Sequence, residues 1–225
     1  MSYWFLLLAV ALGAVIAFYL NPGKKVLQLL LSFSGAYLLS MTVLHLIPEV
    51  YNDHSQNIGV FILIGIIIQT ILEFFSKGAE HGHVHIHTNT TKIPWILFIS
   101  LYIHAFLEGM PLGIQNNSEL LWAIIIHKIP VAVILVIFLI KSGLKKSYIL
   151  GLVLIFAFAS PIGSFFGEKI RFLHNYHEEI SAVIIGIFLH ISTAILFESS
   201  ESHKFNLQKF IAIITGFSVA LIGAL

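Results

Sequence analysis

Three side chains of kinds that bind metals lie in two neighbouring apolar stretches of this sequence. His104 and Glu108 occur in "LYIHAFLEGMPLGI", residues 101–114, and His127 follows in "WAIIIHKIPVAVIL", residues 122–135. His104 and Glu108 are four residues apart, so on a helix they project from the same face about one turn from each other. Two imidazoles and one carboxylate suit zinc and accept other divalent transition metals, with a position left for water.

The elements that must position these side chains are apolar. Of 225 residues, 58% are hydrophobic and 10% are charged, whereas an ordinary soluble domain has about 25% charged residues. Runs near the ~20 residues that cross a bilayer cover Tyr3–Leu20, Val26–Val50, Ile58–Phe75, Ile93–Ile114, Leu120–Ile140, Tyr148–Phe166, Ala182–Phe197 and Leu207–Leu225. Because they lack the alternation of outer-membrane barrels, we predict an all-α polytopic membrane protein with eight transmembrane helices. No basic region precedes the first run, which we interpret as a retained helix and not a signal peptide.

Composition excludes several kinds of chemistry. The chain has no cysteine, so disulfides and thiolate metal sites are excluded and any metal must be bound through nitrogen and oxygen. The net charge of +1 argues against a nucleic-acid partner, which would require a strongly basic patch.

The distribution of basic residues predicts the orientation. If the N-terminus is outside, the inside loops hold eight lysines, whereas the outside loops hold only Lys169 and Arg171. Short cytoplasmic loops carry the excess of lysine and arginine. We therefore expect an integral multi-pass protein of the cytoplasmic (inner) membrane with both termini outside.

On this orientation the loop 76–92 is cytoplasmic and rich in histidine. It contains His81, His83, His85 and His87, alternating with small or apolar residues. Neutral imidazoles of such a tract can bind late first-row metals. A polar linker without metal is the alternative, and the tract alone does not decide between them.

The central pair must be buried inside the helix bundle. His104 lies about 16 Å into its predicted span at the helical rise of ~1.5 Å per residue, near the middle of the bilayer core. A carboxylate at that depth costs on the order of 3 kcal/mol, so Glu108 should face the interior and have a partner. Pro111 and Pro130 each remove a helical hydrogen bond, which we expect to bend or loosen these two helices beside a cavity. The alternative is that His104 and Glu108 form a hydrogen-bonded pair that serves only packing.

Other polar residues offer weaker candidates. Metal capture outside the membrane could use Asp53 and His54 or the stretch "HNYHEE" with His174, His177, Glu178 and Glu179, although solvated surface is the simpler interpretation. His45 and Glu49 in the second span, and His190 and Glu198 at the seventh, could line the route, with plain polar helix ends as the alternative. The likeness of "VLHLIPE" to "FLHISTAILFE" suggests an inverted repeat of spans 1–3 and 6–8 around spans 4–5.

The paired motifs of the fourth and fifth spans resemble one transporter family. "HAFLEGMPLGI" is similar to the fourth span of the ZIP (Zrt-/Irt-like) metal transporters, whose pattern is His-Asn-x-x-Glu/Asp-Gly. "HKIPVA" resembles the fifth-span pattern His-Glu-Ile-Pro-His-Glu of the same family. The resemblance covers residues 1–225 as one transmembrane domain, and it implies uptake of a divalent metal, usually zinc, into the cytoplasm.

The chain departs from the family's pattern at the residues of a second metal. Relatives often use the asparagine of span four, acids of span five and a glutamate in span six, where this sequence has Ala105, Lys128, Val131 and Ser160. We therefore predict a single metal ion bound by His104, Glu108 and His127. We also expect the buried ammonium of Lys128 to lie near Glu108 and to replace the charge of a second cation, unless it points into a wet vestibule.

The leading functional hypothesis is transport of a divalent transition metal, with zinc expected first and Cd²⁺, Fe²⁺ or Mn²⁺ left open. The metal is substrate, and no cofactor is expected. The alternative is an intramembrane zinc-dependent hydrolase, because two histidines, a carboxylate and a water also describe hydrolytic zinc sites. A non-transporting metal sensor is a third class, which could lose the intramembrane ligands that this chain retains. The expected partners are the metal and the lipid bilayer, and whether the chain forms a homodimer is left open.

Overall fold

The structure is a computed structural model that describes residues 2–51, 57–78, 93–115, 117–197 and 206–224, and these ranges contain helices and no strand. Seven helical segments among them are long and apolar enough to cross a membrane. A further apolar helix, α10 (Leu207–Ala224), is shorter. The predicted all-α polytopic class is confirmed, while the eighth predicted span corresponds to this shorter helix.

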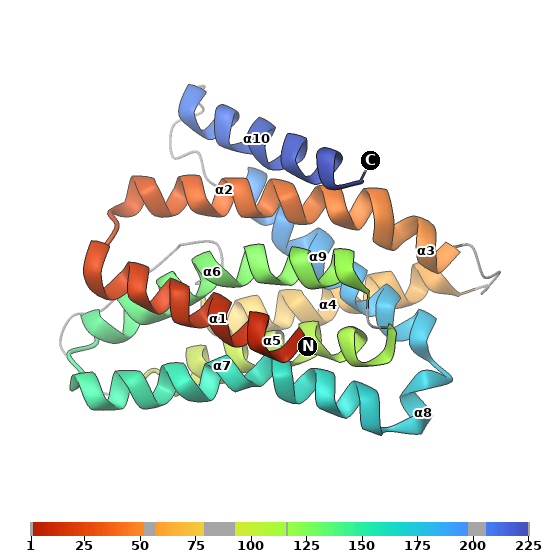
Figure 1. The fold of residues 1–225 in the computed structure, drawn as a ribbon, viewed down its shortest axis with the longest axis horizontal. Helices are drawn as coiled ribbons and strands as arrows, with labels where there is room; N and C mark the ends of the chain where they lie inside the picture. Colours follow the sequence, from red (N-terminus) through yellow and green to blue (C-terminus); the bar gives the residue numbers. More distant parts are fainter. Residues whose placement is uncertain (1, 52–56, 79–92, 116, 198–205, 225) are drawn as a thin grey trace.

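The helices lie side by side along the longest axis of the molecule, with their connections at its two ends (Figure 1). The first two spans contain short π-helical segments, since α1 (Ser2–Val15) continues into η1 (Ile16–Leu20) and α2 (Lys24–Met41) continues through η2 (Thr42–Leu46) into α3 (Ile47–Tyr51). The remaining helices are α4 (Ile58–Ser76), α5 (Trp95–Gln115), α6 (Ser118–Lys141), α7 (Lys146–Lys169), α8 (Arg171–His174) and α9 (His177–Phe197).

The seventh span begins earlier than hydropathy predicts. It was expected from Ala182, but α9 starts at His177 and carries Glu178 and Glu179 in its first turn. Acidic side chains there interact favourably with the positive end of the helix dipole. The polar residues of "HEEI" therefore extend the helix beyond its apolar part.

Helix pairing follows the pattern that an inverted repeat predicts. The most extensive contacts join α5 to α7, α4 to α9, α2 to α10 and α1 to α6. In chain order the eight spans are α1, α2, α4, α5, α6, α7, α9 and α10. An inverted repeat relates spans 1, 2 and 3 to spans 6, 7 and 8, and span 4 to span 5. It therefore relates the α5–α7 pair to the α1–α6 pair, and the α4–α9 pair to the α2–α10 pair. The two helices that carry the candidate ligands, α5 and α6, thus have equivalent positions in the bundle.

The α5–α7 contact depends on glycine. A methyl group added at Gly109 of α5 would overlap the carbonyl oxygen of Ser160 in α7, and one added at Gly163 of α7 would overlap the carbonyl oxygen of Phe106. Small residues allow transmembrane helices to approach closely and pack by van der Waals contact. This close approach brings Ser160 against the backbone of α5 beside Glu108.

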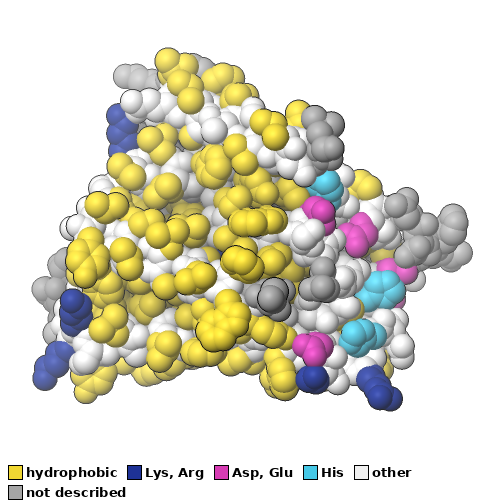
Figure 2. All heavy atoms as spheres, viewed as in Figure 1, with side chains coloured by type: hydrophobic (Ala, Val, Ile, Leu, Met, Phe, Trp, Pro, Cys, Tyr) yellow, Lys and Arg dark blue, Asp and Glu magenta, His cyan; other side chains and the backbone are white. Residues whose placement is uncertain are grey.

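Charged side chains gather at the two ends of the bundle and leave an apolar surface between them (Figure 2). Lysines begin α2 and α7 at one end, whereas acidic and histidine side chains gather at the other, where α7 ends and α9 begins. Large hydrophobic side chains such as Leu63, Leu154 and Ile211 are exposed on the surface between. Such a belt matches the hydrocarbon core of a bilayer.

Candidate metal centre

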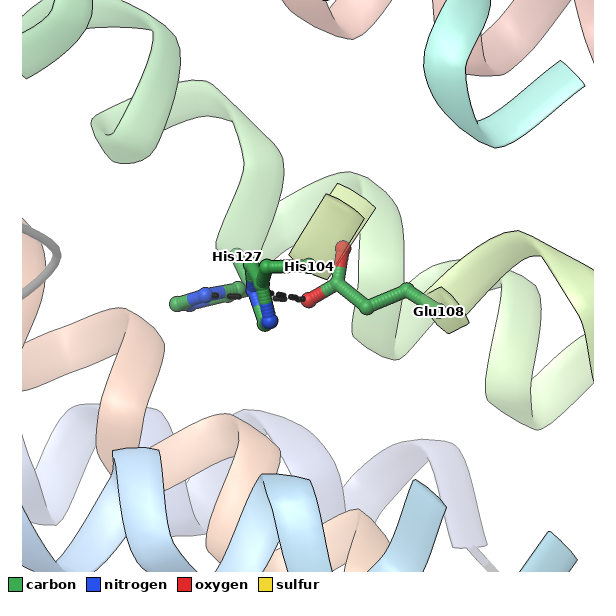
Figure 3. A group of neighbouring side chains, drawn as sticks. All are labelled: His104, Glu108 and His127. Atoms are coloured by element: carbon green, nitrogen blue, oxygen red, sulfur yellow. Dashed lines mark ion pairs between the residues drawn. The ribbon is translucent and has the colours of Figure 1, made fainter. Parts of the chain in front are cut away.

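The structure brings His104, Glu108 and His127 together inside the bundle. His104 and Glu108 come from α5, His127 comes from α6, and their side chains converge (Figure 3). Nε2 of His104 lies 2.8 Å from Oε1 of Glu108, and Nε2 of His127 lies 3.9 Å from the same oxygen. The exposed fractions of the three residues are 1%, 2% and 0%. Glu108 therefore has the interior position and the partner that its depth demanded.

The spacing of these atoms fits the geometry of a small divalent cation. One ligand atom from each residue lies within 4.8 Å of the others. A tetrahedral zinc with bonds of about 2.0–2.1 Å separates its ligand atoms by about 3.3 Å. Two of the three separations, 2.8 and 3.9 Å, lie on either side of that value, and the third is no more than 4.8 Å. The three side chains are therefore close enough to bind one such ion together.

Both prolines lie inside continuous helices. α5 runs through Pro111 and α6 runs through Pro130, so neither helix is interrupted beside the site. Each proline still leaves one carbonyl, that of Leu107 or Ile126, without its usual helical N–H partner. Both helices are thus unbroken at their prolines, and each is loosened by one missing backbone hydrogen bond beside its polar residues.

Lys128 contacts the other oxygen of the carboxylate. Its Nζ lies 3.7 Å from Oε2 of Glu108 and donates a hydrogen bond of 2.5 Å to Oγ of Ser160. That hydroxyl donates in turn to the carbonyl oxygen of Ala105, also at 2.5 Å. The ammonium stands 5.4 Å from the ring centre of Phe156, within cation–π range. With 1% of Lys128 exposed, the predicted proximity to Glu108 is confirmed and the wet-vestibule alternative is wrong.

The positions that relatives use for a second metal offer no ligand here. Ala105 and Val131 are buried in an apolar cluster, with 1% and 3% of their surfaces exposed. The hydroxyl of Ser160 is engaged by Lys128 and by the backbone of α5. The space beside Glu108 is therefore filled by the ammonium and its hydrogen-bond partners.

A serine from a third helix contacts His127. Oγ of Ser34, in α2, lies 3.3 Å from Nδ1 of His127, and Ser34 is buried with 1% exposed. Sequence reasoning missed this residue, because nothing in "LSFSGAY" distinguishes one buried serine from another. Only the packing of α2 against α6 brings the hydroxyl to the ring.

Three of the four residues predicted to line the route, His45, Glu49 and His190, lie within the described ranges. His190 of α9 pairs with Glu73 of α4, a half-buried carboxylate that the sequence analysis missed because it lies at the end of a predicted span. Glu49 accepts a hydrogen bond of 2.9 Å from Nδ2 of Asn117. His45 lies in the π-helical segment η2, and its Nε2 is buried without a hydrogen bond to any residue that the structure describes. Glu198 lies outside the described residues.

The outer-loop candidates are only partly described. His174 and His177 make local contacts, since Nε2 of His174 lies 3.3 Å from the carbonyl oxygen of Glu168 and Nδ1 of His177 lies 3.1 Å from that of His174. Across the described ranges, the only group of three or more metal-ligating side chains that comes together is His104, Glu108 and His127. The outer residues Asp53 and His54, and the tract of His81, His83, His85 and His87, fall outside those ranges.

Comparison with known proteins gives a consistent result. The family model "ZIP Zinc transporter" matches residues 78–224, which include both candidate ligand helices. The chain is 33% identical over 164 residues to "Protein zntD" of Dictyostelium discoideum, covering 63% of this chain and 24% of that protein. It is 28% identical over 154 residues to "Zinc transporter ZIP1" of Danio rerio, covering 63% of this chain and 50% of that protein. The chain thus matches half or less of the length of these relatives.

Proposed function

The chain belongs to the ZIP zinc transporter family, and on that premise we propose that it carries a divalent transition metal, with zinc as the expected ion, across a membrane toward the cytoplasm. The observation that carries this proposal is the buried group of His104, Glu108 and His127, whose ligand atoms converge between two apolar helices. The relatives named as zinc transporters support the choice of ion. Helices with an apolar belt between two charged ends support a multi-pass membrane location.

The proposed site holds one metal ion at a time. His104, Glu108 and His127 supply two imidazole nitrogens and one carboxylate oxygen, and water completes the shell. The ammonium of Lys128 lies next to Oε2 of Glu108. It takes the place of a second cation as a fixed positive charge. Because it also repels the transported ion, it keeps the binding moderate, and a transport site must release its ion as well as bind it.

Entry from the outside is proposed at the end of the bundle that carries the acidic and histidine side chains. A narrow cleft there is lined by Glu49, Gln115 and Ser181 together with Pro111, one turn beyond Glu108. Its free volume of about 10 Å³ is close to the room that a single water needs. The lysine-rich end would then face the cytoplasm, as short cytoplasmic loops prefer basic residues.

The hydrolase alternative gains no support. A hydrolytic zinc site needs a general base beside the metal-bound water, and the nearest further charged group, Lys128, is held by Ser160 and faces Glu108. The family to which the chain belongs is one of transporters. A transported metal, and not a resident catalytic one, accounts for both observations.

The decisive experiment is reconstitution of the chain into liposomes with zinc, cadmium, manganese and iron offered separately. We expect flux of at least one of these ions, with zinc the fastest, and we expect His104→Ala and Glu108→Ala to abolish it. Glu119→Gln changes a carboxylate in the first turn of α6, outside the site, and serves as the control that should keep the flux. No flux of any of the four ions, or flux that is indifferent to both alanine substitutions, would refute the proposal.

A further inference from the structure

We propose that Ser34 of α2 is a positioning residue for His127. The hydroxyl of Ser34 accepts the N–H of His127 Nδ1 and thereby directs the lone pair of Nε2 toward the metal. The inference rests on the proposed function, because it concerns how one ligand of the metal site is held. It adds to the site a residue from a helix that carries none of the ligands.

The geometry places the two ring nitrogens of His127 in different surroundings. Nδ1 lies 3.3 Å from Oγ of Ser34, while Nε2 points to the other side, 3.9 Å from Oε1 of Glu108. Ser34 and His127 have exposed fractions of 1% and 0%, so bulk water does not compete for either nitrogen. The ring is thus held between a hydroxyl and the carboxylate of the site.

Metal binding requires one particular tautomer of this ring. A neutral imidazole carries one N–H, and a nitrogen that binds a metal must present its lone pair. When Nε2 binds the ion, the proton is on Nδ1 and needs an acceptor in a buried place, because an unsatisfied buried donor costs about 1–3 kcal/mol. Ser34 supplies that acceptor. Because a hydroxyl can also donate, the same residue can serve the opposite tautomer when the ion has left.

Three other buried hydroxyls of the bundle are satisfied locally. Ser32 donates to the carbonyl of Gln28 at 2.7 Å, Thr42 to that of Leu38 at 2.7 Å, and Ser192 to that of Phe188 at 2.6 Å. Each of these bonds stays within its own helix and satisfies the hydroxyl locally. Ser34, in contrast, contacts a ring nitrogen on another helix, and that nitrogen belongs to a candidate ligand.

The neighbouring serine gives a matched control. Ser32 is two residues away on the same helix, is buried with 2% exposed, and bonds only to its own helix in the described contacts. We would purify the full chain with His81, His83, His85 and His87 replaced by serine, so that the loop does not bind the probe. Cobalt(II) is then titrated and followed by its visible absorption, and zinc affinity is measured by competition.

We expect Ser34→Ala to weaken zinc binding about tenfold, since loss of a partner of a metal-bound histidine costs 10–100-fold in affinity. The cobalt spectrum should change as well, because a ring that is free to turn alters the ligand field. Ser32→Ala should leave both unchanged, and Ser34→Thr, which keeps the hydroxyl, should restore affinity to within about threefold. If the alanine variant cannot be purified, Ser34→Cys, a weak acceptor of similar size, should show the same weakening.

A double-mutant cycle separates positioning from general destabilisation. In a His127→Ala background, Ser34→Ala should have no further effect on affinity, because the ring that it orients is gone. An affinity and a spectrum for Ser34→Ala equal to those of the parent chain would overturn the inference, and so would a loss of the same size with and without His127. A parent chain that binds neither cobalt nor zinc would instead refute the proposed function itself.

Discussion

The two oxygens of the Glu108 carboxylate face different partners. Oε1 lies 2.8 Å from Nε2 of His104, whereas Oε2 lies 3.7 Å from Nζ of Lys128. One oxygen is therefore available to a metal together with the imidazoles, and the other is paired with a fixed ammonium. The carboxylate and the ammonium form a neutral buried pair before any ion arrives, which explains how both charges are accommodated in an apolar bundle.

Because Lys128 faces one oxygen of the Glu108 carboxylate and the metal would bind the other, removing the lysine charge should change metal affinity. In Lys128→Met the bound ion no longer faces a neighbouring cation, so we expect metal affinity to rise by about tenfold, equivalent to about 1.4 kcal/mol. Slower release should lower the transport rate at saturating metal. Titration of the purified protein and liposome flux test the two effects. Lys141→Met, at the exposed end of α6, is the control, and unchanged affinity and flux in Lys128→Met would exclude the charge-replacement idea.

The carboxylate itself is tested by a substitution that keeps its shape. Glu108→Gln removes the negative charge but retains a side chain of equal size, so the packing around Ala105 and Ser160 should survive. We expect zinc affinity to fall at least 100-fold, since the ion loses its only anionic ligand, and we expect the melting temperature to fall as well, because the buried ammonium of Lys128 loses its compensating charge. Isothermal titration and a thermal melt of the same sample measure both. Zinc affinity within threefold of the parent chain would remove Glu108 from the ligand set.

The filled space beside Glu108 predicts the metal stoichiometry. Because Ala105 and Val131 supply no ligand and Ser160 is engaged by Lys128, one ion per chain should bind inside the membrane. Elemental analysis of protein whose four loop histidines are replaced by serine should give a zinc-to-protein ratio close to one. A reproducible ratio of two in that protein would contradict the single-metal site.

Metal binding should also weaken as the pH falls. Imidazole and carboxylate ligands bind a metal only when they are deprotonated, so protons compete with zinc for the same lone pairs. Between about pH 7.5 and 5.5, where free imidazole titrates, the apparent zinc affinity should decrease steadily and recover when the pH is raised again. A flat profile across that interval would show that histidine nitrogens do not bind the ion. Competition titrations at fixed ionic strength provide the measurement.

The parts of the site that sequence reasoning predicted are those that depend on local spacing. His104 and Glu108 share a face because they are one helical turn apart, and the long apolar runs identify the membrane class without any tertiary information. Ser34 and Glu73 could not be predicted, because their roles arise where α2 meets α6 and where α4 meets α9. No periodicity within one helix specifies which residue of another helix it will touch.

A local signal other than hydropathy explains the error at the start of α9. Hydropathy places the beginning of this span at Ala182, but helix formation also responds to acidic residues in the first turn, and Glu178 and Glu179 begin the helix earlier. For Lys128, by contrast, the sequence supplied a physical reason for a partner, since a deep ammonium must be compensated. The predicted neighbour, Glu108, is the one observed.

The close approach of α5 to α7 makes a prediction about stability. A methyl group at Gly163 would meet the carbonyl oxygen of Phe106, whereas one at Gly151 of the same helix would meet no atom within 4 Å. We expect Gly163→Ala to destabilise the protein by about 1–3 kcal/mol through overpacking, and to weaken metal binding as Ser160 and Lys128 move away from Glu108. Gly151→Ala should be neutral or slightly stabilising, because alanine favours the helix. Thermal unfolding in detergent compares the melting temperatures of the two variants. Equal melting temperatures would contradict the prediction, because the contact between α5 and α7 would then tolerate the extra methyl group.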